Sequence, residues 1–119
     1  MKRGSCRGDR GSGSLLAVGI IGSTVASLAL SLALYVGLGI HQALMHAADA
    51  SALAAADVAA GIWPGSPCAV ADDVATANQV KLDDCAADGL IVTVRTSTGF
   101  LGLKLTSSAT AGPPVVVTN

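Results

Sequence analysis

Cysteine and histidine are the side chains in this sequence with the most reactive atoms. Cys68 and Cys85 lie in the same part of the chain, whereas Cys6 stands alone near the amino terminus. Two cysteines in one segment predict a structural disulfide provided that this segment is exported to an oxidising compartment, which the charge pattern described below predicts. His41 and His46 are five residues apart, so on a helix they face different directions and do not form the i, i+4 pair of a catalytic metal site. Apart from Cys68 and Cys85, the chain has no Cys or His after residue 46, so a metal ion would lack the ligands that it needs. We therefore expect neither a metal site nor a cofactor.

The remaining residue types argue against an enzyme. The chain contains no glutamate that could act as a general base, and it offers no set of acid, base and nucleophile. Its single Trp63, Tyr35 and Phe100 cannot build an aromatic cage, and we interpret Trp63 as a core residue beside a turn. We therefore predict a protein that acts through contacts, with no small-molecule substrate.

These residues are positioned by an uncharged segment, Leu15 to Ile40, which is 26 residues long. A helix of about 20 residues crosses a hydrocarbon core of about 30 Å. The apolar part of a secretory signal is usually about 7 to 15 residues long. We predict an uncleaved transmembrane helix, and a signal peptide cleaved near Ala48 to Ala50 is the alternative.

Charge is divided unequally on the two sides of this segment. Residues 1–14 carry four basic side chains and one acid, whereas residues 41–119 carry three basic and seven acidic ones. The basic side chains of the leader are Lys2, Arg3, Arg7 and Arg10. The positive-inside rule predicts a single-pass protein of a bacterial cytoplasmic membrane, with a cytoplasmic amino terminus and an extracytoplasmic carboxyl-terminal domain. Membrane lipid is the expected partner, and the net acidic exported part excludes nucleic acid.

Small residues recur every four positions along the uncharged segment. On a helix they form one ridge that lets another helix approach closely. The ridge residues are Gly19, Ser23, Ser27 and Ser31. The alternative is that these small residues simply face lipid, and the pattern alone does not decide between the two.

Beyond Ile40 the Ala-rich helical pattern continues to Ala60 and should end at Gly61 to Gly65, where Pro64 cannot extend the helix. Ser66 and Pro67 favour the start of a second helix, which we place at residues 67–80. Alternating apolar residues predict strands at residues 90–95 and 101–105, joined by a turn at residues 97–99.

These elements give an α+β fold, in which a long pilin-like transmembrane helix continues into a small head with a second helix and a β-hairpin. We divide the chain into a cytoplasmic leader (1–14), the transmembrane helix (15–40), an Ala-rich helical extension (41–62) and a disulfide-stapled head (63–119). The apolar face of the hairpin should pack on one of the helices, since an isolated hairpin is marginally stable.

The order of several short motifs resembles the TadE/TadG-like pilus-assembly proteins. It is most similar to short TadE-like proteins of high-GC Gram-positive bacteria that are encoded beside a secretion ATPase and a helicase. The motifs are Asp9-Arg10-Gly11-Ser12 before the span, Ala47-Ala48-Asp49-Ala50-Ser51-Ala52-Leu53-Ala54-Ala55-Ala56 after it, Cys68, Cys85, Asp88-Gly89 and Ala111-Gly112-Pro113.

The resemblance implies a minor pilin-like component of a Flp/Tad-type pilus or of a related secretion system. Its partners would be other pilin-like subunits or platform proteins of that system. Gly11, Ser12, Gly13 and Ser14 are the candidate processing residues. Family pilins carry a glutamate at the fifth position after the cleavage site, where this chain would place Leu16 or Val18. A membrane-anchored regulator of the secretion machine and a secreted effector released after the helix are the alternative functions.

Overall fold

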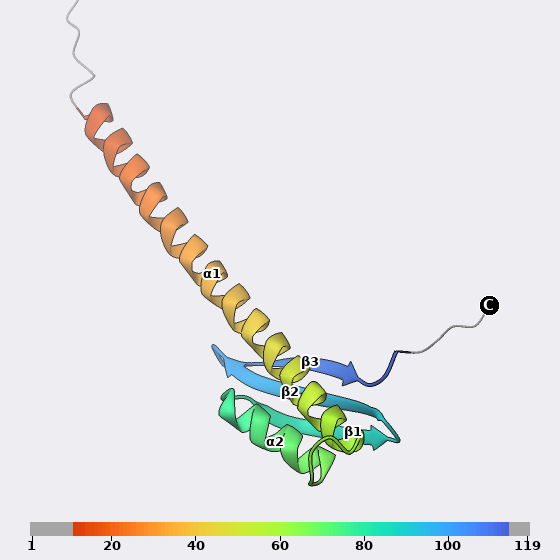
Figure 1. Ribbon diagram of the computed structural model, residues 1–119. Coiled ribbons are helices and arrows are strands. Elements are labelled where there is room, and N and C mark those ends of the chain that lie inside the picture. The colour runs from red at the N-terminus through yellow and green to blue at the C-terminus, as the bar shows by residue number, and fades with distance from the viewer. Residues whose placement is uncertain (1–10, 115–119) are drawn as a thin grey trace, which may run out of the picture. The chain divides into compact units, whose positions relative to one another are not determined.

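A computed structural model describes residues 11–114 of the chain. Figure 1 shows an α+β protein, which confirms the predicted fold class at this level. Its elements are α1 (Ser12–Ala59), α2 (Pro67–Ala77), β1 (Lys81–Asp88), β2 (Ile91–Phe100) and β3 (Leu103–Ala111). The chain forms two compact units, one ending at Val36 and the other beginning at Gly37. The basic residues of the leader and Cys6 lie outside the described residues.

Helix α1 forms because its sequence is rich in Ala and Leu and contains no proline. Among residues 11–114, it is the one helix that is long and apolar enough to cross a membrane. The helix ends as predicted, because Gly61 adopts a positive φ of 77°. The backbone N–H of Gly61 donates to the Val58 carbonyl at 3.0 Å, and that of Ile62 donates to the Asp57 carbonyl at 2.9 Å.

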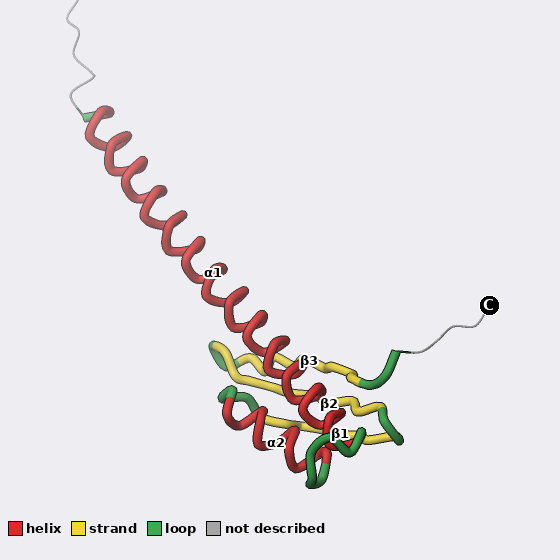
Figure 2. Tube along the Cα trace, viewed as in Figure 1, coloured by secondary structure: helices red, strands yellow, loops and turns green. Residues whose placement is uncertain are grey.

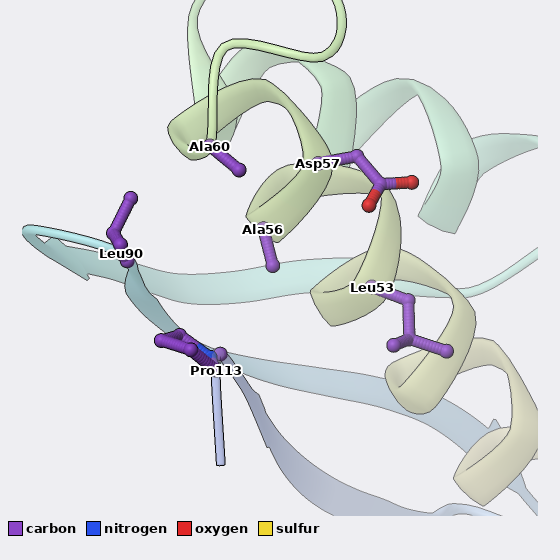
Figure 3. Close-up of a pocket in the computed structure, with 7 residues that line it drawn as sticks. Leu53, Ala56, Asp57, Ala60, Leu90 and Pro113 are labelled. Atoms are coloured by element: carbon purple, nitrogen blue, oxygen red, sulfur yellow. The ribbon is translucent and has the colours of Figure 1, made fainter. Parts of the chain in front are cut away.

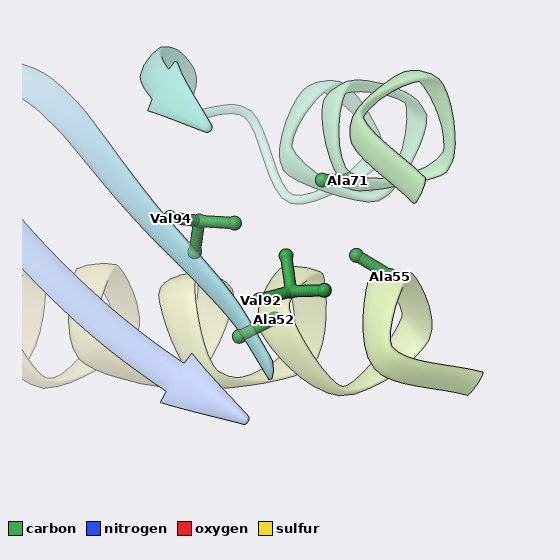
Figure 4. Packing of buried hydrophobic residues seen from close by; sticks show 5 residues of the cluster. All are labelled: Ala52, Ala55, Ala71, Val92 and Val94. Atoms are coloured by element: carbon green, nitrogen blue, oxygen red, sulfur yellow. The ribbon is translucent and has the colours of Figure 1, made fainter. Parts of the chain in front are cut away.

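The last part of α1 is one of two helices that cover a face of the sheet in the second unit. Its buried residues recur at spacings of three and four, as expected for one helical face. They are Leu44, Ala47, Ala48, Ser51, Ala52, Ala55 and Val58. Five of these seven side chains are Ala or Ser, so the helix axis can approach the sheet closely. Figure 4 shows Ala52 and Ala55 beside Val92 and Val94 of β2, with Ala71 of α2 opposite them.

The sheet is antiparallel with the strand order β1-β2-β3 (Figure 2). Val94 in the central strand pairs with Cys85 on one side and with Ala109 on the other. Side chains alternate between the face under the helices and an outer face, as the period of two requires. The predicted packing of the hairpin on the helices is therefore confirmed for Val92 and Val94, whereas Leu101 and Leu103, which we predicted on the same apolar face, are exposed.

Two predicted boundaries are wrong, and one strand was not predicted. The turn lies at Leu101 and Gly102 instead of residues 97–99, because residues 96–98 extend strand β2 and both turn residues adopt positive φ. Helix α2 ends at Ala77 and not at residue 80, because Gln79 adopts a φ of 61° that no helix continues. Strand β1 was not predicted at all, so the hairpin is part of a three-stranded sheet.

Candidate functional site

The surface of α1 before the head is apolar and exposed. Every described side chain from Gly11 to Val36 is exposed, including Leu15, Leu28 and Tyr35. Within residues 11–114 no packing covers this apolar surface, which in a soluble protein would be a liability. A bilayer or another apolar helix is the environment in which such a surface is stable.

The hydroxyl groups of the small-residue ridge are satisfied within the helix. Ser27 Oγ donates to the Ser23 carbonyl at 2.7 Å, and Ser31 Oγ donates to the Ser27 carbonyl at 2.8 Å. Ser23 Oγ donates to the Ile20 carbonyl at 2.9 Å. Because these hydroxyls already have acceptors, the ridge presents small side chains and no unsatisfied polar group.

The candidate processing residues lie where α1 begins. Gly11 precedes the helix, and Ser12, Gly13 and Ser14 are its first three residues. Ser14 Oγ donates to the Gly11 carbonyl at 3.1 Å, and all four residues are exposed. A peptidase that recognises an extended segment would therefore have to open this first turn.

Cys68 and Cys85 form the predicted disulfide, with an S–S distance of 2.06 Å and a Cα–Cα distance of 5.8 Å. Cys68 belongs to the first turn of α2, and Cys85 lies within β1. The bond therefore ties the short second helix to an edge strand. Both cysteines are half-buried, so the bridge is part of the packed layer between α2 and the sheet.

The outer face of the sheet carries an ion pair that sequence reasoning missed. The register of β1 shifts between Leu82 and Asp84, so Asp83 is the extra residue of a bulge. Asp83 Oδ2 lies 2.9 Å from Lys104 Nζ on β3. Ser97 lies on β2, which is the strand between β1 and β3, and it is 4% exposed. The pKa of Asp83 is held below its ordinary value, first by a hydrogen bond from Lys104 and second by one from Ser97.

No alternation or motif in the sequence marks this bulge, which is why the pair could not be foreseen. The wider cluster adds Asp84 and Arg95 to Asp83 and Lys104 around an open depression of about 560 Å³. It holds charges of both signs and is fully open to solvent, so it resembles a solvated sheet face more than a catalytic centre.

A shallow pocket lies between the end of α1 and the turn that joins β1 to β2. It has a volume of about 240 Å³ and is lined by Leu53, Ala56, Asp57, Ala60, Leu90, Gly112 and Pro113. Figure 3 shows Leu90 and Pro113 opposite Ala56. Its one ionisable side chain is Asp57, and the pocket lining holds no second acid or base beside it.

Trp63 does not have the predicted role of a core residue. Its side chain is 66% exposed in the loop between the two helices, next to Ile62, which is equally exposed. The buried residues of the core cluster are Ala and Val, and Trp63 is not among them. His41 and His46 are also exposed on α1. Among residues 11–114, no group of three or more His, Cys or Asp side chains lies close enough to hold a metal ion.

Comparisons of the chain with protein-family models, with curated proteins and with solved structures give no match. The resemblance to TadE-like proteins therefore depends on the order of motifs in the sequence. The features that bear on function are the exposed apolar helix and the small disulfide-bonded head.

Proposed function

We propose that this protein is a membrane-anchored, pilin-like component of a Flp/Tad-type pilus or of a related secretion system. It would act through helix and head contacts and would catalyse no reaction. The observation that carries this proposal is that two parts of α1 have different surroundings. The helix is uncharged and exposed between Leu15 and Val36, and from Leu44 onward it forms part of the core of the head. A pilin-like subunit needs a helix of this kind, which can be held in lipid and later packed against other subunits.

The proposed orientation places the head outside the cytoplasm. The Cys68–Cys85 bond supports this orientation, because structural disulfides persist in oxidising compartments. The small-residue ridge of α1 is the proposed contact surface for a neighbouring helix. The charge division of the sequence supports the same orientation.

The burial of α1 argues against release of the head by a signal peptidase. Cleavage near Ala48 to Ala50 would separate Leu44 and Ala47 from the head, and both are 1% exposed there. Leu44 is also one of the largest fully buried side chains of the described chain. Losing such a side chain from a core usually costs about 2–5 kcal/mol, which a head of this size can hardly lose without unfolding.

The absence of glutamate favours one alternative, a regulator of the secretion machine that stays in the membrane. A pilin with Leu16 or Val18 at its fifth position would lack the acid that pairs with the amino terminus of a neighbouring subunit. Such a regulator would cross-link to platform proteins of the secretion system and would not be incorporated into fibres.

The intact mass of the protein tests these functions directly. It should be measured on protein from the native membrane and on any extracellular form, with and without reductant. A mass lacking residues 1–11 or 1–13 would indicate prepilin-type processing. A full-length mass would favour the anchored regulator, and an extracellular head lacking about the first 47 residues would contradict both.

A further inference from the structure

The turn between β2 and β3 exposes apolar side chains that no part of the head covers. Leu101 is 81% exposed and Leu103 is 68% exposed, which makes Leu101 more exposed than any other large apolar side chain among the described residues. Phe100, Leu101, Gly102 and Leu103 form an uncharged run of four residues, which we call the hairpin tip.

The backbone of the hairpin tip adds to the case that Leu101 has a role other than turn formation. Phe100 pairs with Leu103, so the turn has two central residues, Leu101 with φ 50° and Gly102 with φ 76°. Two-residue turns with two positive φ values favour Asn-Gly, and a leucine rarely adopts this conformation. A strained and exposed leucine breaks two local rules together, which is typical of a functional position.

The hairpin tip lies beside the end of the uncharged segment of α1. A β-carbon placed on Gly37 would be 3.7 Å from Phe100 Cε1, so the Phe100 ring packs against the helix at this level. Gly37 precedes His41, the first residue after the uncharged segment, by four residues, or about 6 Å along the helix axis. The hairpin tip is therefore next to the part of α1 that would leave the membrane.

The depth of Gly37 in a bilayer follows from the length of the uncharged segment. Twenty-six helical residues extend about 39 Å, which exceeds a hydrocarbon core of about 30 Å. Gly37 and the residues up to Ile40 would then lie in the interfacial layer, where apolar side chains enter by about 5–10 Å. Lys104 follows the tip directly, although its ammonium group also pairs with Asp83.

We propose that the hairpin tip inserts into the membrane interface beside α1 and forms a second lipid contact of the head. Leu101 and Leu103 would enter the boundary between the lipid headgroups and the acyl chains. The Phe100 ring would fill the space between the hairpin tip and α1. The turn between β1 and β2 lies at the opposite end of the sheet. The inference rests on the membrane anchoring that the proposed function includes, and it is independent of whether the protein enters a pilus.

The test is lipid quenching of a fluorophore at the hairpin tip of the full-length chain. Cys6 is replaced by serine, the Cys68–Cys85 bond stays oxidised, and Leu101→Cys carries the environment-sensitive label NBD. The protein is reconstituted into phosphatidylcholine–phosphatidylglycerol vesicles, with or without lipids that carry a doxyl quencher near the head of the acyl chain. Leu90→Cys is the matched control, because Leu90 lies in the turn at the opposite end of the same sheet.

We expect a blue-shifted emission and strong doxyl quenching at position 101, with neither effect at position 90. Equal quenching at the two positions would overturn the inference. A blue shift at position 101 without doxyl quenching would also overturn it and would point to contact with a second copy. A label at position 28, near the middle of the uncharged segment, separates the two claims when it is read with a doxyl quencher near the end of the acyl chain, since this position would lie near the bilayer centre. Quenching at 28 without quenching at 101 contradicts the hairpin contact alone, whereas no quenching at either position contradicts the membrane anchoring as well.

Discussion

Removal of the Cys68–Cys85 bond should destabilise the head by about 3 kcal/mol at 25 °C. The two cysteines are separated by 17 residues in the chain. The entropy that this cross-link removes from the unfolded state grows with the logarithm of the loop length, and a loop of this size gives the figure of about 3 kcal/mol. Alanine introduces no polar group, and the thiol that remains in a single variant is small and only weakly polar, so the loss of the cross-link should dominate the change.

The effect should be clearest in α2, because this helix contributes little packing of its own. Ala71 and Ala75 are its buried residues, and both are small. Hydrogen exchange of the full-length chain in detergent micelles would report on α2 and β1 separately. If exchange proceeds through unfolding of the head, a loss of about 3 kcal/mol accelerates it by about two orders of magnitude. The variants to compare are Cys68→Ala, Cys85→Ala and the double substitution.

The three variants distinguish a bond from two independent side-chain contributions. Both single variants should show the same acceleration, and the double variant should add little, because all three remove one bond. Losses that add up in the double variant would refute the reasoning. Cys6→Ala is the control with no expected change, and reductant should accelerate exchange in the native chain but not in the double variant.

Four further predictions address the core, the outer sheet face and the helix ridge. Ala55→Leu should lower the free energy of unfolding, measured by thermal or denaturant unfolding, by about 1–3 kcal/mol, because Ala55 is fully buried and a larger side chain would overpack the core. Ala43→Leu, on the exposed side of the same helix, is the control and should change this free energy little. Thr96→Val should stabilise the head by about 1 kcal/mol, since Thr96 Oγ1 is buried without a hydrogen-bond partner among the described residues; a destabilised variant would show that the hydroxyl is satisfied. The pKa of Asp83 is lowered in the fold, so its contribution to stability should be complete above pH about 4 and be lost as the pH falls through the folded-state pKa, and Asp83→Asn should remove this part of the acid sensitivity. Ser27→Leu should weaken any self-association of α1 measured by energy transfer in vesicles, and unchanged association would exclude the ridge as the contact surface.

The features that were predicted correctly depend on local sequence. The end of α1 is set by Gly61, which adopts the left-handed conformation that glycine favours at a helix end. Pro67 occupies the first position of α2, where its missing N–H has no cost, although the Ser66 side chain makes no capping hydrogen bond. The disulfide followed from the predicted export of the head and from the number of cysteines on each side of the uncharged segment.

The features that were missed depend on tertiary contacts. Strand β1 contains Asp83, Asp84 and two alanines, and its sequence shows no alternation of apolar and polar residues. It becomes a strand because β2 offers a pairing edge and because Cys85 is bound to α2. The turn at Leu101 was misplaced for a related reason, since leucine at a positive φ is not a turn signal in any sequence rule.

A comparison of two faces of α1 bears on the role of the ridge. In the head, Ser51 Oγ donates to the Ala47 carbonyl at 2.8 Å and is fully buried against the sheet. In the uncharged segment, Ser27 makes the same bond to the carbonyl four residues before it, at 2.7 Å. The hydroxyl of Ser51 has its acceptor within the helix, so burial leaves it satisfied, and the serine packs as a small side chain. Ser27 and Ser31 of the ridge make the same bond as Ser51, which lies on a helix face that is already buried in this chain. The ridge can therefore be covered by a neighbouring helix without leaving a hydroxyl unsatisfied, and this supports its proposed role as a contact surface.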